Sequence, residues 1–315
     1  MIQSPLNYTG GKFKLLPQIL PLFPKDISRF YDFFCGGCNV GINIDCEEVN
    51  FIDCDKNLIY LYQAFQNLDK EEIFNLIHQI ISDYDLSLVS QNGYKFYDCE
   101  SSKGLGEYNR NSFNKLREDF NKCKIFDYHY YVMLYVLIVY AFNNQIRFNS
   151  EGKFNLPVGK RDFNSSMQKK LSAFIDRVQS ISCKFICQDF RNLNIEKFFE
   201  KDFVYCEPPY LITCATYNEN GGWNEEDEKD LLNFLDKINL RGIKFALSNV
   251  LSSKGKENKI LLEWLNKNSE TYRAVHLQYS YSNSNYHKTD KSSASDEVLI
   301  VNYAIDERQV NPLGN

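Results

Sequence analysis

The chain has 315 residues, of which 43% are hydrophobic and 24% charged, and its formal net charge is −5. This composition is ordinary for a globular protein and excludes a chain that is mostly disordered. The acidic balance also excludes a surface that attracts nucleic acid as a whole, so any contact with nucleic acid needs a local basic patch.

Short apolar runs bounded by turn residues predict strands, and runs of helical periodicity predict helices between them. In chain order we expect a helix at 13–20, strands at 29–34 and 49–53, helices at 57–67, 73–81, 130–142 and 168–178, strands at 185–187 and 203–206, a helix at 225–238, a strand at 244–248, a helix at 258–266 and a strand at 298–303. This alternation predicts a largely parallel α/β sheet of the Rossmann-like type, whose ligands bind beyond the carboxyl ends of the strands. Residues 69–170 lack the alternation and predict an inserted helical module.

The longest apolar run, at residues 130–142, is shorter than the roughly 20 residues that span a bilayer. The chain also opens without the features of a secretion signal. We therefore expect a cytoplasmic protein with no membrane partner, and we interpret the apolar run as a buried helix.

Ten cysteines occur at irregular spacing, which predicts reduced thiols rather than a disulfide framework. Cys35 and Cys38 form a CxxC pair, and Cys183 and Cys187 form a CxxxC pair, but no histidine lies close to either pair in the sequence. We interpret all four as small buried hydrophobic residues and expect no metal site.

A strand that runs into glycines is the first candidate ligand site, in the sequence YDFFCGGCNVG at residues 31–41. Gly36 and Gly37 permit a close approach of the backbone to a ligand, and a helix that starts near Gly41 would offer amides to an anion. The next strand ends in Asp53 and Asp55, where α/β nucleoside sites carry an acid that binds the ribose. The alternative is a tight turn followed by an aspartate that caps a helix.

The sequence VYCEPPYL at residues 204–211 is the second candidate. Glu207, Pro208 and Pro209 form a rigid bend, because neither proline has an N–H and both hold φ at about −65°. A carboxylate and a carbonyl in such a bend can accept both hydrogens of a planar amine while Tyr210 stacks on its ring. These contacts favour the pyramidal amine that attacks a sulfonium methyl group. The alternative is a strand that ends in Pro-Pro for structural reasons alone.

The opening sequence SPLNYTGGKFKLL is the third candidate. Tyr8 and Lys12 flank Thr9, Gly10 and Gly11 just before a predicted helix. Such a loop can close over a small ligand and present an amine to its carboxylate, and the alternative is a simple N-terminal cap.

The most basic stretch lies at residues 143–170, with six basic residues against two acidic ones. Within it, the sequence AFNNQIRFNSEGKFNLPVGKR at 141–161 combines arginine, amides and aromatic rings with turn residues. Arginine pairs with guanine, asparagine or glutamine pairs with adenine, and an aromatic ring can enter a base stack. We expect a β-hairpin near 142–161 that reads nucleic acid, and the alternative is a solvated structural loop.

Taken together and in this order, the sequences TGGK, FFCGGCNVG, FNNQIRFN with FNLPVGKR, and PPY resemble the D12 class of DNA adenine-N6 methyltransferases, the Dam-like family. The resemblance implies a Rossmann-like S-adenosylmethionine-dependent catalytic domain at 1–68 and 171–315, with an inserted helical DNA-recognition domain at 69–170. The implied activity is methylation of adenine N6 in double-stranded DNA, at GATC or a related site. A cognate restriction endonuclease would be a further partner.

The resemblance also implies roles for individual residues. The catalytic set is Glu207, Pro208, Pro209 and Tyr210. The cofactor-binding set is Tyr8, Lys12, Phe34, Cys35, Gly36, Gly37, Asn39, Asp53, Asp189 and Phe190. The DNA-binding set is Asn7, Phe142, Asn143, Arg147, Asn149, Pro157, Lys160 and Arg161. Among these, Asp53 would hold the ribose, Asp189 and Phe190 would lie near the cofactor's adenine, Phe142 would enter the space of the flipped base, Asn143 would contact the orphaned partner base, and Arg147 would read a guanine.

One residue departs from the family's pattern, in which the acid before Pro-Pro is usually aspartate, or asparagine in relatives, because here it is Glu207. The extra methylene moves the carboxylate by more than ~1 Å, and misplacement on that scale can lower a rate about a hundredfold. A variant that tolerates glutamate, an inactive relative and a deliberate substitution that traps substrate all remain open. The alternative functions are therefore a DNA- and cofactor-binding protein without methyl transfer, and a methyltransferase of RNA or free nucleotides.

Overall fold

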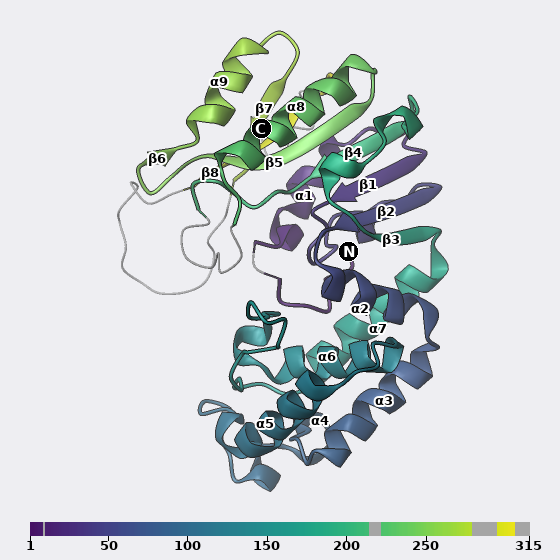
Figure 1. Ribbon diagram of the computed structural model, residues 1–315, viewed down its shortest axis with the longest axis vertical. Coiled ribbons are helices and arrows are strands. Elements are labelled where there is room, and N and C mark those ends of the chain that lie inside the picture. The colour runs from purple at the N-terminus through teal and green to yellow at the C-terminus, as the bar shows by residue number, and fades with distance from the viewer. Residues whose placement is uncertain (9, 214–221, 279–294, 306–315) are drawn as a thin grey trace, which may run out of the picture. The chain divides into compact units, whose positions relative to one another are not determined.

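The computed structural model describes residues 1–8, 10–213, 222–278 and 295–305 (Figure 1). The chain divides into two compact units. Unit 1 comprises Met1–Gly11, Gly36–Asn43 and Asp55–Cys187, and unit 2 comprises Lys12–Cys35, Ile44–Cys54 and Gln188–Asn315. The predicted domains, which meet at residues 68 and 170, are defined by function, whereas the two units are defined by contacts. The predicted boundaries therefore stay a prediction.

Unit 2 is built on a mixed sheet in which the strands follow the order β2-β1-β4-β5-β8-β7 (Figure 1). Its strands are β1 (Arg29–Phe33), β2 (Glu48–Asp53), β4 (Asp202–Cys206), β5 (Lys244–Ser253), β6 (Lys256–Glu257), β7 (Arg273–His276) and β8 (Asp296–Val301). The four strands β2, β1, β4 and β5 run parallel, whereas β8 is antiparallel to both β5 and β7. Every residue of β4 is buried, as expected for a parallel strand covered on both faces. The predicted α/β sheet is confirmed.

The helices of unit 2 show how capping and proline decide helix length. α8 (Glu225–Leu240) begins with a capping box, in which the side chains of Asn224 and Asp227 each accept the other's backbone N–H. α9 (Lys259–Lys267) is capped by Asn258. The single helix predicted at 13–20 is instead a series of short turns, with α1 limited to Leu16–Ile19 between two 3-10 helices. Prolines near the start of α1 and of the following turn interrupt the backbone hydrogen bonds, so the prediction of one continuous helix is wrong there.

Unit 1 is mainly helical. Its helices are α2 (Lys56–Asn67), α3 (Lys70–Asp83), α4 (Val89–Asn92), α5 (Gly106–Lys122), α6 (Tyr128–Tyr140) and α7 (Ser165–Ser180), and its strand is β3 (Cys183–Cys187). α6 is apolar on all sides and contacts α2, α3 and α5, which confirms the buried helix predicted from the longest apolar run. The helix predicted to start near Gly41 is only a 3-10 turn at Gly41–Asn43.

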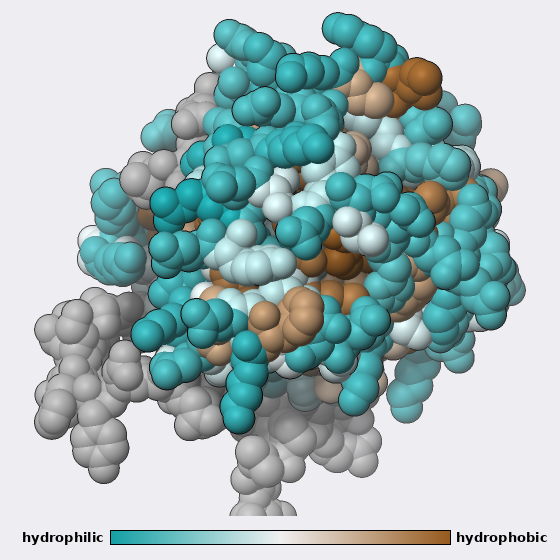
Figure 2. Space-filling view, turned by 90° about the horizontal axis from the view of Figure 1, so that it is seen from below, coloured by the Kyte–Doolittle hydropathy of each residue, from teal (hydrophilic) through white to brown (hydrophobic). Residues whose placement is uncertain are grey.

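The surface of unit 1 is mostly polar at the end that carries α4 and α5. Figure 2 looks onto this end and shows hydrophilic side chains over most of the face, with hydrophobic ones in small patches between them. None of the described helices is both long enough and apolar enough to cross a membrane.

The cysteine predictions are confirmed at three of four positions. Cys35, Cys38 and Cys183 are buried. Cys187 is exposed, because it is the last residue of β3 and the packing that covers Cys183 does not extend to the end of the strand. The nine cysteines within the described ranges are free thiols.

Candidate functional site

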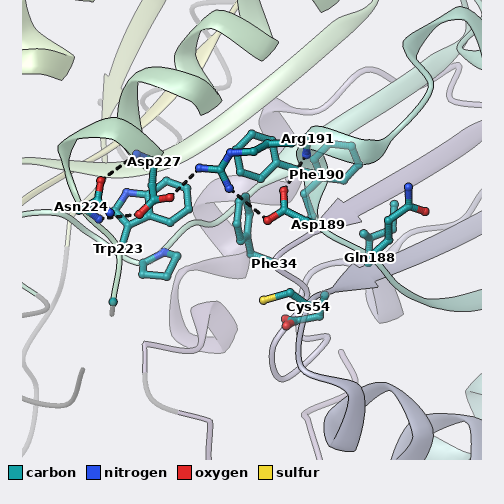
Figure 3. Close-up of a pocket in the computed structure, with 14 residues that line it drawn as sticks. Phe34, Cys54, Gln188, Asp189, Phe190, Arg191, Trp223, Asn224 and Asp227 are labelled. Carbon is teal, nitrogen blue, oxygen red and sulfur yellow. Dashed lines mark hydrogen bonds and ion pairs between the residues drawn. The ribbon is translucent and has the colours of Figure 1, made fainter. Parts of the chain in front are cut away.

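Unit 2 contains a pocket of about 420 Å³ at the carboxyl ends of β1 and β2 (Figure 3). This volume lies in the range of small-molecule sites, and the ends of parallel strands are where α/β sheets place them. Five residues predicted from the sequence line the pocket, namely Phe34, Asp53, Asp189, Phe190 and Pro209. The pocket therefore collects residues from two of the four candidate sequences, together with Asp189 and Phe190, which only the family resemblance implied.

Four aromatic residues line the pocket, and three of them, Phe34, Phe190 and Trp223, have their rings close to one another. The ring of Phe34 lies with its centroid 5.5 Å from that of Phe190 and 5.4 Å from that of Trp223. Phe34 follows β1 directly and has a left-handed backbone with φ of 58°, which costs roughly 1–2 kcal/mol in a residue with a Cβ atom. Strain of this kind persists only where the surroundings impose it, and here it accompanies an aromatic side chain in the pocket wall.

The charged side chains around the pocket are organised by Arg191 (Figure 3). Its Nη1 lies 3.1 Å from Asp189, its Nη2 2.6 Å from Asp227 and its Nε 2.7 Å from Asp230. The guanidinium also lies 4.6 Å over the ring of Phe190. Burial works to lower the pKa of Arg191, but the three acids raise it overall. Each nitrogen group of this arginine is thus engaged by a carboxylate.

Two neighbouring aspartates separate the two interpretations of the second strand. Asp53, the last residue of β2, lines the pocket and is 9% exposed. Its carbonyl oxygen accepts the N–H of Gln188 at 3.0 Å. Asp55 caps α2 through the N–H groups of Asn57 and Leu58. The helix-cap interpretation therefore holds for Asp55, while Asp53 faces the candidate ligand site.

A second cluster in unit 2 surrounds Lys12, whose side chain is only 3% exposed. The Nζ atom of Lys12 lies 2.9 Å from Oε1 of Glu207, 3.9 Å from Oε2 of Glu297 and 4.8 Å from the ring centroid of Tyr210. The other carboxylate oxygen of Glu207 accepts a long hydrogen bond of 3.4 Å from the hydroxyl of Tyr205. The acid before Pro-Pro is thus held by an ammonium group and a phenol.

Burial and charge oppose each other in this cluster. Burial raises the pKa of Glu207, and the ammonium of Lys12 partly reverses that shift. Burial also works to lower the pKa of Lys12, but Glu207, Tyr210 and Glu297 raise it overall. Oε2 of Glu297 is buried, lies 3.9 Å from Nζ of Lys12 and accepts no hydrogen bond from the described residues.

The glycine turn and the N-terminal segment meet in unit 1. A Cβ atom on Gly36 would lie 2.7 Å from the ring of Tyr8, and Gly36 has a φ of +45°. The hydroxyl of Tyr62 donates to the carbonyl of Gly36 at 2.8 Å. The side chain of Asn39 accepts the N–H of Ser4 at 3.0 Å. Tyr8 therefore packs against the turn that contains Gly36 and Asn39.

Two further predicted cofactor residues, Gly37 and Cys35, have structural roles of their own. Gly37 lies beside Asn39, whose Nδ2 would be 3.0 Å from an added Cβ atom. Cys35, in unit 2, is buried and donates its N–H to the carbonyl of Ile52 at 3.1 Å. Lys12 is absent from the pocket lining, and Thr9 of the TGGK sequence lies outside the described residues.

The segment at 141–161 folds back on itself in unit 1. Antiparallel bridges join Ala141 to Val158 and Phe148 to Phe154. The side chain of Asn149 accepts the N–H groups of Glu151 and Lys153, and so it closes the turn. Asn121 of α5 makes two hydrogen bonds, of 2.8 and 3.0 Å, with the backbone of Phe154. A helix thus supports one arm of the hairpin.

Within this hairpin Arg147 is partly buried and Phe142 is exposed. Nε of Arg147 donates to Oδ1 of Asn155 at 2.8 Å, and Nη2 approaches the backbone carbonyl of the same residue at 3.4 Å. Phe142 is 49% exposed, while its N–H donates to the carbonyl of Pro157 at 2.9 Å. Exposure alone does not single out Phe142, because Phe96, Phe126 and Phe199 are more exposed; what distinguishes Phe142 is its place beside the hairpin that carries Arg147.

The other residues predicted to contact DNA lie close to these two in the chain, except Asn7, which belongs to the N-terminal segment. Asn143 has a left-handed backbone with φ of 56°, and its carbonyl accepts a hydrogen bond of 2.9 Å from the side chain of Asn7. Lys160 and Arg161 are exposed. Apart from Asn149, which closes the turn, these side chains are on or near the surface of unit 1.

Several residues of both clusters have no signal in the sequence motifs. Trp223, Arg191 and Asp227 line the pocket, and Glu297 reaches Lys12 from β8. Trp223 directly precedes the N-cap of α8 and Asp227 lies in its first turn. The sequence predicted this helix at 225–238 but no ligand role for either residue. Glu297 lies ninety residues beyond Glu207, and no local pattern relates the two.

Comparison with known proteins assigns the chain. The sequence model of the D12 class N6 adenine-specific DNA methyltransferases matches residues 8–288. Type II methyltransferase M.FokI of Planomicrobium okeanokoites is 40% identical over 308 residues, which are 96% of this chain and 43% of that protein. Modification methylase StsI of Streptococcus sanguinis is 36% identical over the same shares. DNA adenine methylase of Escherichia coli is 25% identical over 68% of this chain and 66% of that protein. The chain thus spans less than half the length of the first two relatives.

Proposed function

Because the chain belongs to the D12 class of N6 adenine-specific DNA methyltransferases, we propose that it methylates N6 of adenine in double-stranded DNA with S-adenosylmethionine as the methyl donor. The observation that carries this proposal is the pocket at the ends of β1 and β2, with its aromatic walls and its excess of acids. The same pocket includes Pro209 of the acid-Pro-Pro-Tyr sequence.

The pocket's residues fit a cationic nucleoside. Phe34, Phe190 and Trp223 provide aromatic faces for a flat heterocycle. Asp53, Asp189 and Asp227 outnumber the one basic lining residue, Arg191, which is already engaged by carboxylates. This charge balance disfavours the phosphates of a dinucleotide and favours a ligand that carries sulfonium and ammonium groups.

Within this pocket, we assign Asp53 to the ribose hydroxyls and Asp189 with Phe190 to the adenine ring. S-adenosylmethionine, when bound, would supply an electrophilic methyl group. The proposed cofactor roles of Tyr8, Lys12, Cys35, Gly36, Gly37 and Asn39 rest on the family resemblance.

For the chemical step, we assign the grip on the target amine to Glu207 and the backbone of Pro208. The carboxylate and the carbonyl accept the two N–H groups, which leaves the nitrogen lone pair free to attack a methyl group. As the carbon–nitrogen bond forms, the bond between sulfur and the methyl carbon would break and S-adenosylhomocysteine would leave. The positively charged nitrogen would then release an acidic proton to water, so a base with a high pKa is not needed. Tyr210 would stack on the target ring. Lys12, 2.9 Å from Glu207, fixes the position of the carboxylate.

We assign DNA recognition to the hairpin of residues 142–161, which belongs to a proposed target-recognition domain at 69–170. The proposed catalytic domain comprises residues 1–68 and 171–315. The exposed ring of Phe142 supports insertion into the space left by a flipped base. Asn155 holds one edge of Arg147, which leaves its other N–H groups for a guanine. Asn7, Asn143, Asn149, Pro157, Lys160 and Arg161 complete the proposed DNA surface. GATC or a related site is the proposed target, and a cognate endonuclease a proposed partner.

The second candidate function is a protein that binds S-adenosylmethionine and DNA without transferring methyl. The ion pair between Lys12 and Glu207 favours it, because this pair already occupies a carboxylate oxygen that the reaction requires. Methylation of RNA or free nucleotides is a further alternative, which competition by duplex DNA would test.

Incubation with S-adenosylmethionine labelled on the methyl group and genomic DNA free of N6-methyladenine tests the proposal. Incorporation into adenine N6 is the expected result. Binding of both ligands without incorporation would support the second candidate, and failure to bind S-adenosylmethionine would contradict both. Sequencing of the product by a method that detects N6-methyladenine would identify the site.

A further inference from the structure

Trp223 lies in the pocket wall directly before the N-cap of α8 (Figure 3). Its ring meets that of Phe34 edge to face, at 87° and 5.4 Å, and lies 6.2 Å from that of Phe190. The side chain is only partly buried. An indole at the surface of a pocket has a face available for a planar ligand, whereas a tryptophan that serves only as core packing has none.

The indole N–H is held by a carboxylate deep in unit 2. Nε1 of Trp223 donates to Oε2 of Glu228 at 2.6 Å, and Glu228 is completely buried. Oε1 of Glu228 accepts hydrogen bonds from Asn249 at 3.0 Å and from Asn258 at 2.8 Å. These three donors come from the pocket wall, from β5 and from the cap of α9. The carboxylate therefore connects the indole to two other elements of the fold.

A buried carboxylate is a costly way to fill space. Charged groups in protein interiors destabilise the fold unless hydrogen bonds replace their hydration, and an apolar residue often packs as well. Glu228 accepts such hydrogen bonds, and one of them comes from Trp223, a side chain that lines the pocket. The acid therefore determines where the indole lies, a function that an apolar residue could not perform.

The other side of the same helical turn is also anchored. Arg191 contacts Asp227 and Asp230, which flank Glu228 in the first turns of α8. The wall from Trp223 to Asp227 is thus held by ionic contacts on one side and by the Glu228 network on the other. A wall that is ordered before binding lowers the entropy lost when a ligand enters.

We propose that Trp223 is the aromatic wall against which the adenine ring of S-adenosylmethionine rests, and that Glu228 is the positioning residue that sets the orientation of the indole. This inference rests on the proposed function, because it names a binding residue for the proposed cofactor.

Binding of S-adenosylhomocysteine to the full chain tests the inference without any need for methyl transfer. The chain has two tryptophans, and the second, Trp264, is buried against Tyr272 with its ring centroid 4.5 Å away. We expect the ligand to change the fluorescence of the wild type and of Trp264→Phe equally. Trp223→Phe should lose this change, because it removes the only indole in the pocket.

Affinity measured by calorimetry provides the second readout. Trp223→Ala should weaken binding by about tenfold or more, which is the scale of a stacked base. Glu228→Gln should also weaken binding, because an amide cannot accept all three hydrogen bonds. The loss should be smaller than for Trp223→Ala, because the indole is still present. Glu225→Gln, at a side chain 74% exposed on the same helix, is the matched control and should bind as the wild type does.

The outcomes separate the inference from the proposed function. If the wild type binds S-adenosylhomocysteine and Trp223→Ala binds equally well, the inference is wrong and the cofactor proposal stands. If the wild type does not bind, the cofactor proposal fails as well. Should Glu228→Gln not fold, Trp223→Phe tests the positioning role, because it deletes the same hydrogen bond and keeps an aromatic ring. A severalfold loss of affinity in that variant supports the role, and unchanged affinity contradicts it.

Discussion

The pocket of unit 2 and the hairpin of unit 1 hold their functional side chains in different ways. In the pocket, Arg191 contacts three carboxylates and Glu228 accepts three hydrogen bonds. The described part of the hairpin has two isolated bridges, and Arg147 is held by the neutral side chain of Asn155. Hydrogen bonds to ionised groups are roughly twice as strong as neutral ones. The pocket is therefore ordered in advance, while the hairpin can adjust to a larger partner.

The largest effect is expected from Glu207→Asp, which tests the methyl-transfer step separately from ligand binding in the pocket. If the acid is too long by one methylene, shortening it should raise the rate of methyl transfer, by up to about a hundredfold. Glu207 does not line the pocket, so affinity for S-adenosylhomocysteine should change little. Single-turnover transfer of labelled methyl and calorimetry measure the two quantities. A fall in transfer would show that the acid is misassigned.

Arg147→Ala tests whether the hairpin reads sequence independently of the pocket. We expect a loss of about 1 to 3 kcal/mol of discrimination at one guanine of the site, with cofactor affinity unchanged. Asn155→Ala should give a smaller loss at the same base pair, because it frees the guanidinium without removing it. Competition binding with duplexes altered one base pair at a time measures the effect.

The control for Arg147 is Lys153→Ala, in the same hairpin. Lys153 pairs with Glu151 and its side chain is 56% exposed. This variant should lower the affinity for every duplex by a similar small factor. If Arg147→Ala lowers the affinity for every duplex equally, Arg147 contacts only phosphates.

Replacing glycines compares how well the two turns tolerate a side chain. Gly36→Ala and Gly152→Ala both impose a left-handed backbone on alanine, which costs about 1 to 2 kcal/mol of stability. At Gly36 the new Cβ atom would also lie 2.7 Å from Tyr8, whereas at Gly152, in the hairpin turn, nothing lies within 4 Å. Gly36→Ala should therefore lower the free energy of unfolding more, as measured by denaturant titration. Equal losses would mean that the ring of Tyr8 moves freely.

The smallest effect is expected in the pH dependence of methyl transfer. Burial raises the pKa of Glu207 above the ordinary value of 4.5. Below its pKa the acid is protonated and loses an acceptor for the amine, so transfer should fall as the pH is lowered. That fall should begin at a higher pH than for an exposed glutamate. Glu207→Gln should be slow and lack this acidic limb, and an unchanged limb in that variant would assign it to another group.

Local sequence was sufficient where the chemistry of a few adjacent residues decides the structure. β1, β2 and β4 were predicted because each is an apolar run that ends at turn residues, and α6 because its run is apolar on every side. The acid-Pro-Pro-Tyr bend was also predicted from local sequence, because prolines restrict the backbone wherever they occur, and it stays a prediction. Helix continuity at 13–20 was overestimated for the same reason, since its prolines were given too little weight.

By itself, the sequence determined the α/β class, the family and the set of motifs, because each of these follows from short-range periodicity or from side chains close together in the chain. Only the tertiary structure decided which residues share a pocket and what holds them. Trp223 with Phe34, and Lys12 with Glu297, come from segments whose separation along the chain has no fixed relation to distance in space. Packing of the sheet and its helices brings such groups together, and burial then sets their charge and their hydrogen bonds.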